Sequence, residues 1–583
     1  MKKQAYPVTR LTGGQDVSVD AIFLTDQSSP YLRNVRFSKG MIKKGLGKRT
    51  FGTGLPLEGT VMYIDTFMTS GTVNNLMCTP KWIYKYDSTT DTYTKKNSQV
   101  TTGAIALTFV ASTKKITRGS GSFVTDGFTS GTIITTNATL NPGPFTAVTV
   151  AALEIVVTET VVDEGPVTKT ATGVVPLTGD EDYQFSSVML QDAAGADLYA
   201  LTNGKDYIQK YDGGSGNLAN LAGWVTAEIT GKRLASHSSR LVVGHTIESG
   251  TICPRRVRWS ISGDVEDCTG TGSGFVDLVE TSDWIVAVMV LKGKLYVIKE
   301  KSIWELVYVG GTKIYRPELR IGGIGTYSPN SVANLGEEII FYGFDNIYLY
   351  DGINPVPIAK NIHPHLYATE TKIVNSEKVN RSPGVYIEEL GVYALCLPTQ
   401  GDVPDLLAEY YFEEKSWTLR NRSVTAFGYY TVPSGDKWSE LTGTWAAQTW
   451  TWMERTLQSG APTVLMGDSD GYVYEDNRIT KSTEPMCVDT KDWIFGHAER
   501  IVEFRAEVKG GPFTCSYSLD GGESWSGTKT FAVSSSWQEC VWFLNLTTQK
   551  FRVRLESSAE DFDIIWMEPW YIPRQRSKGI ATS

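Results

Sequence analysis

Histidine is rare in this sequence and cysteine motifs are missing, which excludes the commonest metal sites. The five histidines form no HExxH motif and no comparable spacing of metal ligands. His363 and His365 come nearest to such a motif, and they are predicted to lie in a loop after a strand. The seven cysteines are scattered without a CxxC pair, so free thiols in a reducing compartment are expected, with one or two incidental bridges as the alternative. We therefore expect no metal and no cofactor.

Catalytic signatures are missing as well. There is no GxxxxGK[ST] phosphate loop and no GxSxG nucleophile elbow. Two carboxylate pairs, Asp468 with Asp470 and Glu413 with Glu414, could serve a propeller glycosidase. Both pairs fall in hairpin-like turns, where acidic residues are common for solvation and local turn bonding. The sequence predicts a protein that is not an enzyme, and a propeller hydrolase is the alternative.

Long apolar runs are also lacking. No stretch approaches the ~20 apolar residues that cross a bilayer, and the opening MKKQAYPVTRLTGG has no apolar region behind its lysines, so neither a signal peptide nor a membrane segment is expected. A net charge of −9 argues against a protein that coats nucleic acid or anionic membranes.

Glycine and aromatic residues, in contrast, are abundant, with 56 Gly, 16 Trp and 28 Tyr. Glycine supplies tight turns and aromatics suit the half-buried faces of strands, so the composition indicates an all-β fold. Units of an alternating strand, a turn and an aromatic-rich strand recur along the chain. Aromatic anchors recur about every 45 to 63 residues, at Tyr211, Trp259, Trp304, Tyr348, Tyr411 and Tyr474.

This spacing is close to the ~40–50 residues of a four-stranded propeller blade. It predicts a β-propeller of about seven blades, with two separate β-sandwiches as the competing interpretation. The expected domains are an extended N-terminal arm (1–57), the propeller (58–101 and 174–488), an inserted small β-barrel-like domain (102–173) and a C-terminal β-sandwich (489–583). The insert is Thr-, Val- and Gly-rich, and the last segment alternates cleanly.

A local basic tract lies within the expected arm. No acidic residue occurs from Gln27 to Leu57. A solvated loop is one interpretation, and an arm that docks on an acidic partner or faces phosphate is the other. The candidate docking residues are Arg33, Arg36, Lys39, Lys43, Lys44, Lys48 and Arg49.

Two aromatic segments suggest further features. Ser518–Trp525 resembles the Asp box of sialidase-like propellers, which in that family is a structural hairpin. The cluster KWSELTGTWAAQTWTWMER could stack sugars, or it could be an ordinary strand pair. It contains Trp438, Trp445, Trp450 and Trp452.

The opening of the chain resembles bacteriophage tail proteins of the nozzle, or tail-hub, family. A Gly-Gly near the start precedes the pattern that carries the resemblance, which is Asp26, Ser29-Pro30, Asn34-Val35-Arg36-Phe37, Gly40-Met41-Ile42-Lys43, Gly45 and Lys48-Arg49. The insert also resembles a small β module of phage virion proteins. The resemblance covers the arm, the insert and the propeller layout, and is weak over the C-terminal domain.

The resemblance implies a structural virion protein of a short-tailed phage, assembled in the host cytoplasm. Proteins of this family form a homo-oligomeric, hexameric ring below the adaptor. The ring lines the DNA exit channel without sequence-specific binding, and it anchors a distal needle or tail fibres. The basic tract would dock on the adaptor. A receptor- or carbohydrate-binding propeller is the alternative function.

Overall fold

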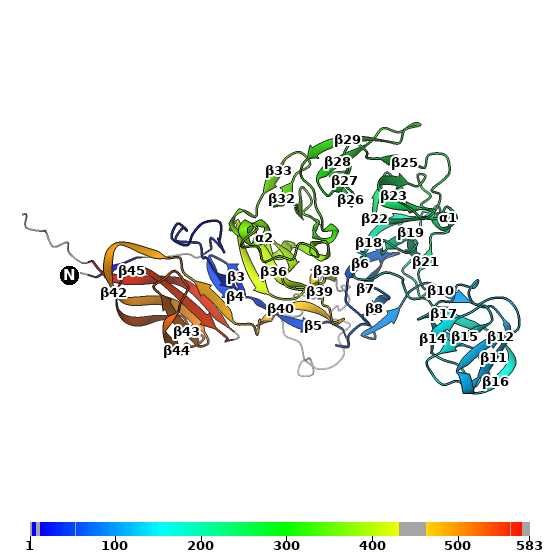
Figure 1. Cartoon of the computed structure of the whole chain (residues 1–583), viewed down its shortest axis with the longest axis horizontal. Coiled ribbons are helices and arrows are strands. Elements are labelled where there is room, and N and C mark those ends of the chain that lie inside the picture. Colours follow the sequence, from blue (N-terminus) through cyan, green and yellow to red (C-terminus); the bar gives the residue numbers. More distant parts are fainter. Residues whose placement is uncertain (1–2, 7–11, 53, 431–461, 560, 574–583) are drawn as a thin grey trace, which may run out of the picture.

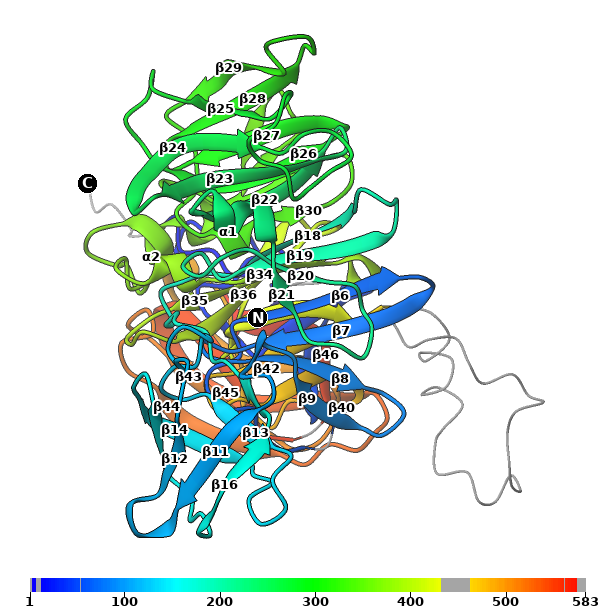
Figure 2. The same ribbon diagram turned by 90° about the vertical axis from the view of Figure 1, so that its right-hand side faces the viewer.

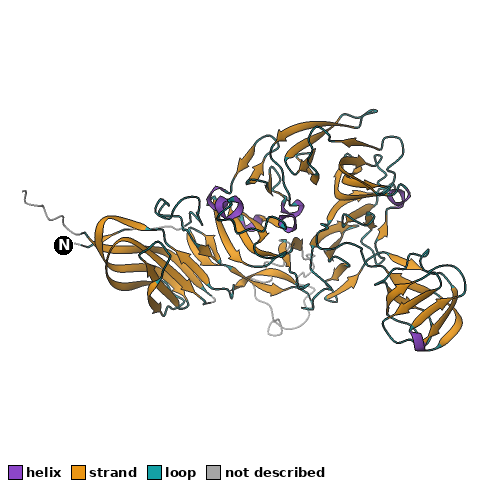
Figure 3. Ribbon diagram, viewed as in Figure 1, coloured by secondary structure: helices purple, strands orange, loops and turns teal. Residues whose placement is uncertain are grey.

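The computed structural model describes residues 3–6, 12–52, 54–430, 462–559 and 561–573, and within them the chain is almost entirely β (Figure 1, Figure 3). The described helices are short: α1 (Ala222–Thr226), α2 (His363–Tyr367) and the 3₁₀ turns η1 (Ala111–Thr113), η2 (Pro329–Ser331), η3 (Lys360–Ile362), η4 (Val379–Arg381) and η5 (Glu388–Leu390). No helix in this part of the chain is long and apolar enough to cross a membrane.

Seven four-stranded antiparallel sheets form a β-propeller, which confirms the predicted fold class and blade number. Blade 1 consists of β6 (Tyr63–Thr69), β7 (Thr72–Cys78), β8 (Ile83–Asp87) and β9 (Thr92–Lys95). Blade 2 consists of β18 (Ser186–Gln191), β19 (Asp197–Thr202), β20 (Gln209–Tyr211) and β21 (Ala219–Asn220). Blade 3 consists of β22 (Ile229–His237), β23 (Arg240–Glu248), β24 (Thr251–Trp259) and β25 (Gly274–Asp277).

Blades 4 to 6 follow without interruption. Blade 4 consists of β26 (Ile285–Leu291), β27 (Lys294–Lys299), β28 (Ser302–Tyr308) and β29 (Tyr315–Gly322). Blade 5 consists of β30 (Ala333–Asn334), β31 (Ile339–Tyr342), β32 (Ile347–Tyr350) and β33 (Pro355–Pro357). Blade 6 consists of β34 (Gly384–Ile387), β35 (Val392–Pro398), β36 (Pro404–Tyr411) and β37 (Ser416–Asn421).

Blade 7 takes its fourth strand from the other end of the chain. It consists of β38 (Ala426–Tyr430), β39 (Thr463–Gly467), β40 (Val473–Lys481) and the N-terminal β5 (Leu46–Thr50). Strand β5 runs antiparallel to β40, with Thr50 opposite Tyr474 and Lys48 opposite Asp476. Segments more than 400 residues apart therefore share one sheet, and this pairing closes the ring.

The aromatic anchors that predicted the blades share one structural position. All six lie on the third strand of their blade, from Tyr211 on β20 to Tyr474 on β40. That strand is covered by its neighbour blades on both faces, so a large side chain buries more apolar area there than at an edge.

Apolar side chains fill the spaces between blades rather than the blades themselves. One cluster of buried residues lies at each junction from blade 1–2 round to blade 6–7. A seventh joins blade 7 to blade 1 through Phe51, Tyr86 and Tyr430, whose rings contact one another. Since every blade buries its faces against two others, the ring has no free blade face.

The inserted domain lies between blades 1 and 2, and its eight strands form a nearly closed barrel-like sheet around one core (Figure 2). Leu107, Phe109, Ile116 and Phe123 are among its buried residues. Its strands are β10 (Gln99–Thr101), β11 (Ile105–Val110), β12 (Lys115–Arg118), β13 (Ile133–Thr136), β14 (Phe145–Val150), β15 (Glu154–Val157), β16 (Glu164–Lys169) and β17 (Ala171–Val174).

The C-terminal domain, for which a β-sandwich is predicted, has ten strands connected through the long β45 around a single core. Its strands are β1 (Gln4–Ala5), β2 (Leu32–Arg33), β3 (Val35–Ser38), β4 (Met41–Lys44), β41 (Met486–Asp489), β42 (Trp493–Gly510), β43 (Phe513–Ser518), β44 (Ser526–Phe531), β45 (Gln538–Ser557) and β46 (Phe562–Ile572). The main strand order starts at β2 and ends at β3, which are joined only by Asn34.

The N-terminal segment expected to be an extended arm (1–57) thus forms strands β1 to β5 instead. The reason is hydrogen bonding: β2 pairs with β41, β4 with β46 and β5 with β40. Each pairing satisfies backbone groups that an extended arm would leave to water, and each buries apolar side chains such as Leu32, Val35 and Ile42.

One face of the propeller carries acidic residues with few basic residues to balance them. In an antiparallel four-stranded blade, the turns between strands one and two and between strands three and four lie at the same end. The twelve such turns of blades 1–6, here called the turn face, carry thirteen acidic residues and three lysines. The acids are Asp91, Asp192, Asp212, Asp264, Glu266, Asp267, Glu337, Glu338, Asp351, Glu388, Glu389, Glu413 and Glu414, and the lysines are Lys292, Lys313 and Lys415.

Ring closure can be tested at Phe51, which is 9% exposed in the blade 7–1 core. We expect Phe51→Ala to lower the free energy of unfolding by about 3–5 kcal/mol, because it removes a buried ring and leaves a cavity. Urea unfolding followed by circular dichroism measures the change. Phe23→Ala, at a side chain that is 76% exposed, is the matched control. A Phe51→Ala protein as stable as the control would contradict the closure.

Candidate functional site

Residues 12–50, here called the N-terminal clamp, connect the propeller to the C-terminal domain. Asn34 occupies the centre of the connection at a φ of 58°. Its backbone N–H donates to Leu419 O at 3.0 Å, and its side-chain oxygen accepts from Asn421 N at 2.9 Å, both on blade 6. Its side-chain nitrogen donates to Pro485 O at 2.8 Å, just before β41. Asparagine suits this position because it tolerates the left-handed region and can bond in both directions.

A buried ion pair lies beneath this connection. Arg420 Nη1 donates to Glu409 Oε1 at 2.7 Å, and Arg420 Nη2 donates to Leu46 O at 2.7 Å. Both charged side chains are less than a tenth exposed. Burial by itself lowers the pKa of Arg420, but the negative charges of Glu409 and Asp476 outweigh it and hold that pKa above its ordinary value. The guanidinium therefore stays charged and ties blade 6 to the clamp.

The seven predicted docking residues lie on this clamp, and six of them make contacts within the chain. Lys44 is fully buried and donates to Ala559 O, and Lys43 lies 3.7 Å from Asp563. The others are Arg33, which donates to Gln15 Oε1; Arg36, which donates to Lys44 O; Lys48, whose Nζ lies over the Tyr474 ring; and Arg49, which pairs with Glu475. Lys39, Lys48 and Arg49 are exposed. Adaptor docking stays a prediction, and Lys44 is too buried to meet a partner.

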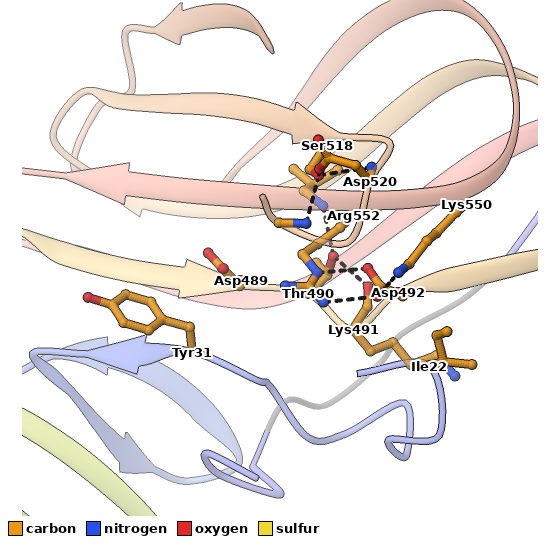
Figure 4. Close-up of polar contacts among 12 residues, drawn as sticks. Ile22, Tyr31, Asp489, Thr490, Lys491, Asp492, Ser518, Asp520, Lys550 and Arg552 are labelled. Atoms are coloured by element: carbon orange, nitrogen blue, oxygen red, sulfur yellow. Dashed lines mark hydrogen bonds and ion pairs between the residues drawn. The ribbon is translucent and has the colours of Figure 1, made fainter. Parts of the chain in front are cut away.

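A polar network fixes the far side of the clamp on the C-terminal domain (Figure 4). Asp492 is 2% exposed and accepts two bonds from Arg552, at 2.8 and 2.9 Å, and an ion pair from Lys550 at 3.1 Å. Its backbone N–H donates to Ala21 O in the clamp at 3.2 Å. Ser29 Oγ donates to Asp489 O at 2.6 Å. Both carboxylate oxygens and the backbone N–H of Asp492 are hydrogen-bonded within the chain. The network therefore serves structure rather than ligand binding.

The turn that resembles an Asp box stands beside this network, between β43 and β44. Ser518 Oγ donates to Asp520 Oδ1 at 2.6 Å and accepts from Gly522 N at 2.8 Å. Ser524 N donates to Asp520 Oδ1 at 3.0 Å. The hydrogen bonds from Ser518 and Ser524 hold the pKa of Asp520 well below its ordinary value. The aspartate is used to shape its own hairpin.

The other candidates from the sequence do not converge on a reaction centre. Asp468 Oδ1 accepts from the backbone N–H groups of Asp470 and Tyr472, at 3.0 and 2.9 Å, so it caps its own turn. His363 contacts Asp345 O at 3.1 Å. Among the described residues no group of three or more His, Cys, Asp or Glu side chains could hold a metal. The tryptophan cluster at 438–452 lies outside the described residues.

The mouth of the propeller channel, opposite the turn face, is crossed by ion pairs. Arg381, before blade 6, bonds to Glu181 and Asp182, before blade 2, at 2.9 and 2.7 Å. Asn330, before blade 5, donates to Gln184 at 2.7 Å. Burial raises the pKa of Asp182, but the Arg381 and Lys378 contacts outweigh it and lower that pKa. These loops therefore hold one another across the axis at this end of the channel.

Sequence reasoning did not find this arrangement of partners. Glu409 and Arg420 stand 11 residues apart on adjacent strands; Glu409 lies between Ala408 and Tyr410, and Arg420 follows Leu419. A charged residue in an otherwise apolar strand is a detectable signal. Its partner on the N-terminal clamp is not detectable, because the contact spans 374 residues.

Comparisons with known proteins return likenesses of fold with low overall similarity. Among solved structures, the chain is similar to a carbohydrate-binding module (CBM6cm-2) of Cellvibrio mixtus lichenase 5A in complex with cellotriose, at 11% identity over 20% of this chain and 80% of that one, with a TM-score of 0.14. It is similar to the C-terminal CBM6 of LamC from Zobellia galactanivorans at 16% identity over 19% and 80%, with a TM-score of 0.13.

The likeness that spans most of the chain is to the WD40 domain of Pan2 from Neurospora crassa. It covers 65% of this chain and 91% of that one, at 9% identity and a TM-score of 0.27. No family model and no curated protein matches the sequence. What is established is the class: an all-β protein with a seven-bladed propeller and a nearly closed barrel-like domain.

The buried ion pair of the junction can be tested by a double-mutant cycle. We expect Arg420→Met and Glu409→Gln each to lower the free energy of unfolding by about 3–5 kcal/mol, since each leaves polar groups without a partner. The double variant should be closer to the unmodified protein than the sum of the two losses. Urea unfolding followed by tryptophan fluorescence measures the three values, and strictly additive losses would contradict the pairing.

His245 makes stability depend on pH. It is 5% exposed and contacts Ile285 O at 3.2 Å. Burial, with the charges of Lys232 and Arg233, lowers its pKa from 6.5 to about 4. Because the folded pKa lies below the unfolded one, the unfolded chain binds the proton first. The stabilisation is present above pH 6.5 and is lost as the pH falls towards 4, by about 3 kcal/mol.

We expect His245→Asn to reduce the loss of stability between pH 6.5 and 4, because asparagine accepts the positive φ of 55° and does not titrate in this range. Thermal unfolding at several pH values measures the slope. His497→Asn, at an exposed histidine, is the control and should keep the original slope. An unchanged slope in His245→Asn would contradict the assignment.

Proposed function

We propose that this chain is a structural virion protein of a bacteriophage tail, and that copies of it form a ring below the adaptor. The ring, a homohexamer, surrounds the DNA exit channel and anchors distal tail parts, either a needle or fibres. The chain works by presenting surfaces and is not an enzyme. The observation that carries the proposal is the net negative charge of the turn face.

The turn face suits a wall along which DNA slides. Its thirteen acidic residues against three lysines leave a net charge of −10, compared with −9 for the whole chain. The rest of the sequence therefore has a net charge close to zero. A like-charged wall repels phosphate over a Debye length of about 8 Å at physiological salt, so it does not trap the passing duplex.

The closed channel mouth supports an assembly role in a different way. Arg381, Glu181 and Asp182 cross the axis of the propeller, so the duplex has no passage through a single chain. A channel for DNA then has to be made between copies of the chain. The propeller acts as a rigid wall segment, and the insert and C-terminal domain extend from it in different directions (Figure 1).

The exposed basic residues of the N-terminal clamp are the proposed adaptor contact. Lys39 stands at the tip of the β3–β4 hairpin, while Lys48 and Arg49 lie on the outer strand of blade 7. Exposed cations at a sheet edge favour an acidic partner and discourage edge-to-edge pairing with another strand.

A receptor- or carbohydrate-binding role is the second candidate. It is favoured by a polar pocket between blades 2 and 3 that is large enough for a small ligand. The two functions are compatible, since a tail ring can also present a binding site to the outside.

The proposal is tested by native mass spectrometry and negative-stain imaging of the purified chain. We expect a sixfold ring, and in a reconstruction we expect the turn face to line its lumen. A monomer or a trimer at micromolar concentration would contradict the ring. A sixfold ring whose lumen is lined by lysine and arginine would contradict the DNA-wall role of the turn face.

A further inference from the structure

A pocket of about 450 Å³ opens where the inserted domain joins the propeller. Three parts of the chain build it: the two linkers of the insert, at Ser98 and 175–178; the outer strands of blade 2; and the start of blade 3 with its 249–250 turn. The volume falls within the ~300–1,000 Å³ that is usual for small-molecule sites. It is separate from the channel mouth and from the turn face.

Several polar side chains of this pocket make no hydrogen bond to any described residue. Thr230 Oγ1 is buried and has no partner. Gln209 is 5% exposed, yet its amide bonds to no described residue. Buried hydroxyls are nearly always paired in folded proteins, so the Thr230 hydroxyl points to a missing partner. Further polar groups of the lining are open to solvent and free to bond a ligand. They belong to the partly buried Ser98 and Tyr207 and to the exposed Asn220, Glu228 and Ser249.

The charges of the lining select against anions. Lys205 is the cation of the pocket, and its Nζ already donates to Thr178 O at 3.1 Å and lies over the Tyr183 ring at 5.2 Å. The Asp206 carboxylate accepts from Thr178 N at 2.9 Å and Asn203 Nδ2 at 2.7 Å. Asp206 and Glu228 give the lining two carboxylates against the one cation of Lys205, so its net charge is −1. A phosphate or sulfate would be repelled.

The remaining groups match a neutral polyol. Hydroxyls and amides both donate and accept, as sugar hydroxyls do, and a carboxylate accepts from two neighbouring hydroxyls. Val175, Pro176, Leu177 and Ile247 contribute apolar surface to the lining, which can contact the C–H face of a pyranose. We propose that this pocket, the blade 2–3 pocket, binds a neutral mono- or disaccharide. Gln209 and Thr230 are the proposed hydrogen-bonding partners, and the exposed Glu228 adds a carboxylate acceptor.

This inference goes beyond the structural role and does not depend on it. A chain that forms the ring but binds no sugar would contradict only the pocket proposal. A monomer that binds sugar would contradict only the ring proposal. The two experiments therefore fail independently.

The test is saturation-transfer NMR and calorimetry of the full chain with glucose, galactose, mannose, N-acetylglucosamine, lactose and maltose. Thr230→Val and Gln209→Ala are the pocket variants. Thr528→Val and Gln549→Ala, at exposed positions of the C-terminal domain, are the matched controls. Thr230→Val keeps the side-chain shape and removes a hydroxyl that has no protein partner, so its melting temperature should stay equal or rise.

We expect at least one of these sugars to bind, at least tenfold more weakly to each pocket variant and unchanged to each control. Sodium phosphate at the same concentrations should give no signal. No binding by any of the six sugars at 10 mM would overturn the proposal. Binding that the pocket variants leave unchanged would overturn it too, because the sugar would then sit elsewhere.

Discussion

The antiparallel pairing of β5 with β40 is the constraint on which the rest of the structure depends. It brings residues 46–50 beside residues 473–481 and completes blade 7. Without it, the faces of blades 7 and 1 would lose their shared core around Phe51, and the ring would present two open blade faces. Such long-range pairing costs chain entropy, and it is repaid only when the complete ring forms.

The same segment has a second role, because β2, β3 and β4 enter the sheet of the C-terminal domain just before β5 enters the propeller. The Asn34 bonds and the Glu409–Arg420 pair fill the short gap between the two bodies. The two bodies share a core at this junction, with Phe37 against Tyr411 at 5.2 Å.

Charge and shape are divided between surfaces. The turn face has an excess of acidic residues, the clamp carries three exposed cations, and the acidic residues at the channel mouth are paired with Arg381 and Lys378. The blade 2–3 pocket stands apart from all three. Outer strands end their sheets with features that discourage pairing, such as Pro355 and Pro357 on β33 and Pro317 on β29.

The sequence by itself determined the all-β class and the seven blades. Strand alternation and turn chemistry are local, and the anchors from Tyr211 to Tyr474 recur because each blade needs a large side chain on its third strand. Only the tertiary structure decided that the basic tract forms strands and where its lysines are buried. Lys44 meets Ala559 and Arg420 meets Leu46 across hundreds of residues, and no local pattern encodes such partners. The pocket at Gln209 and Thr230 is likewise a product of packing, since its walls come from three separate segments.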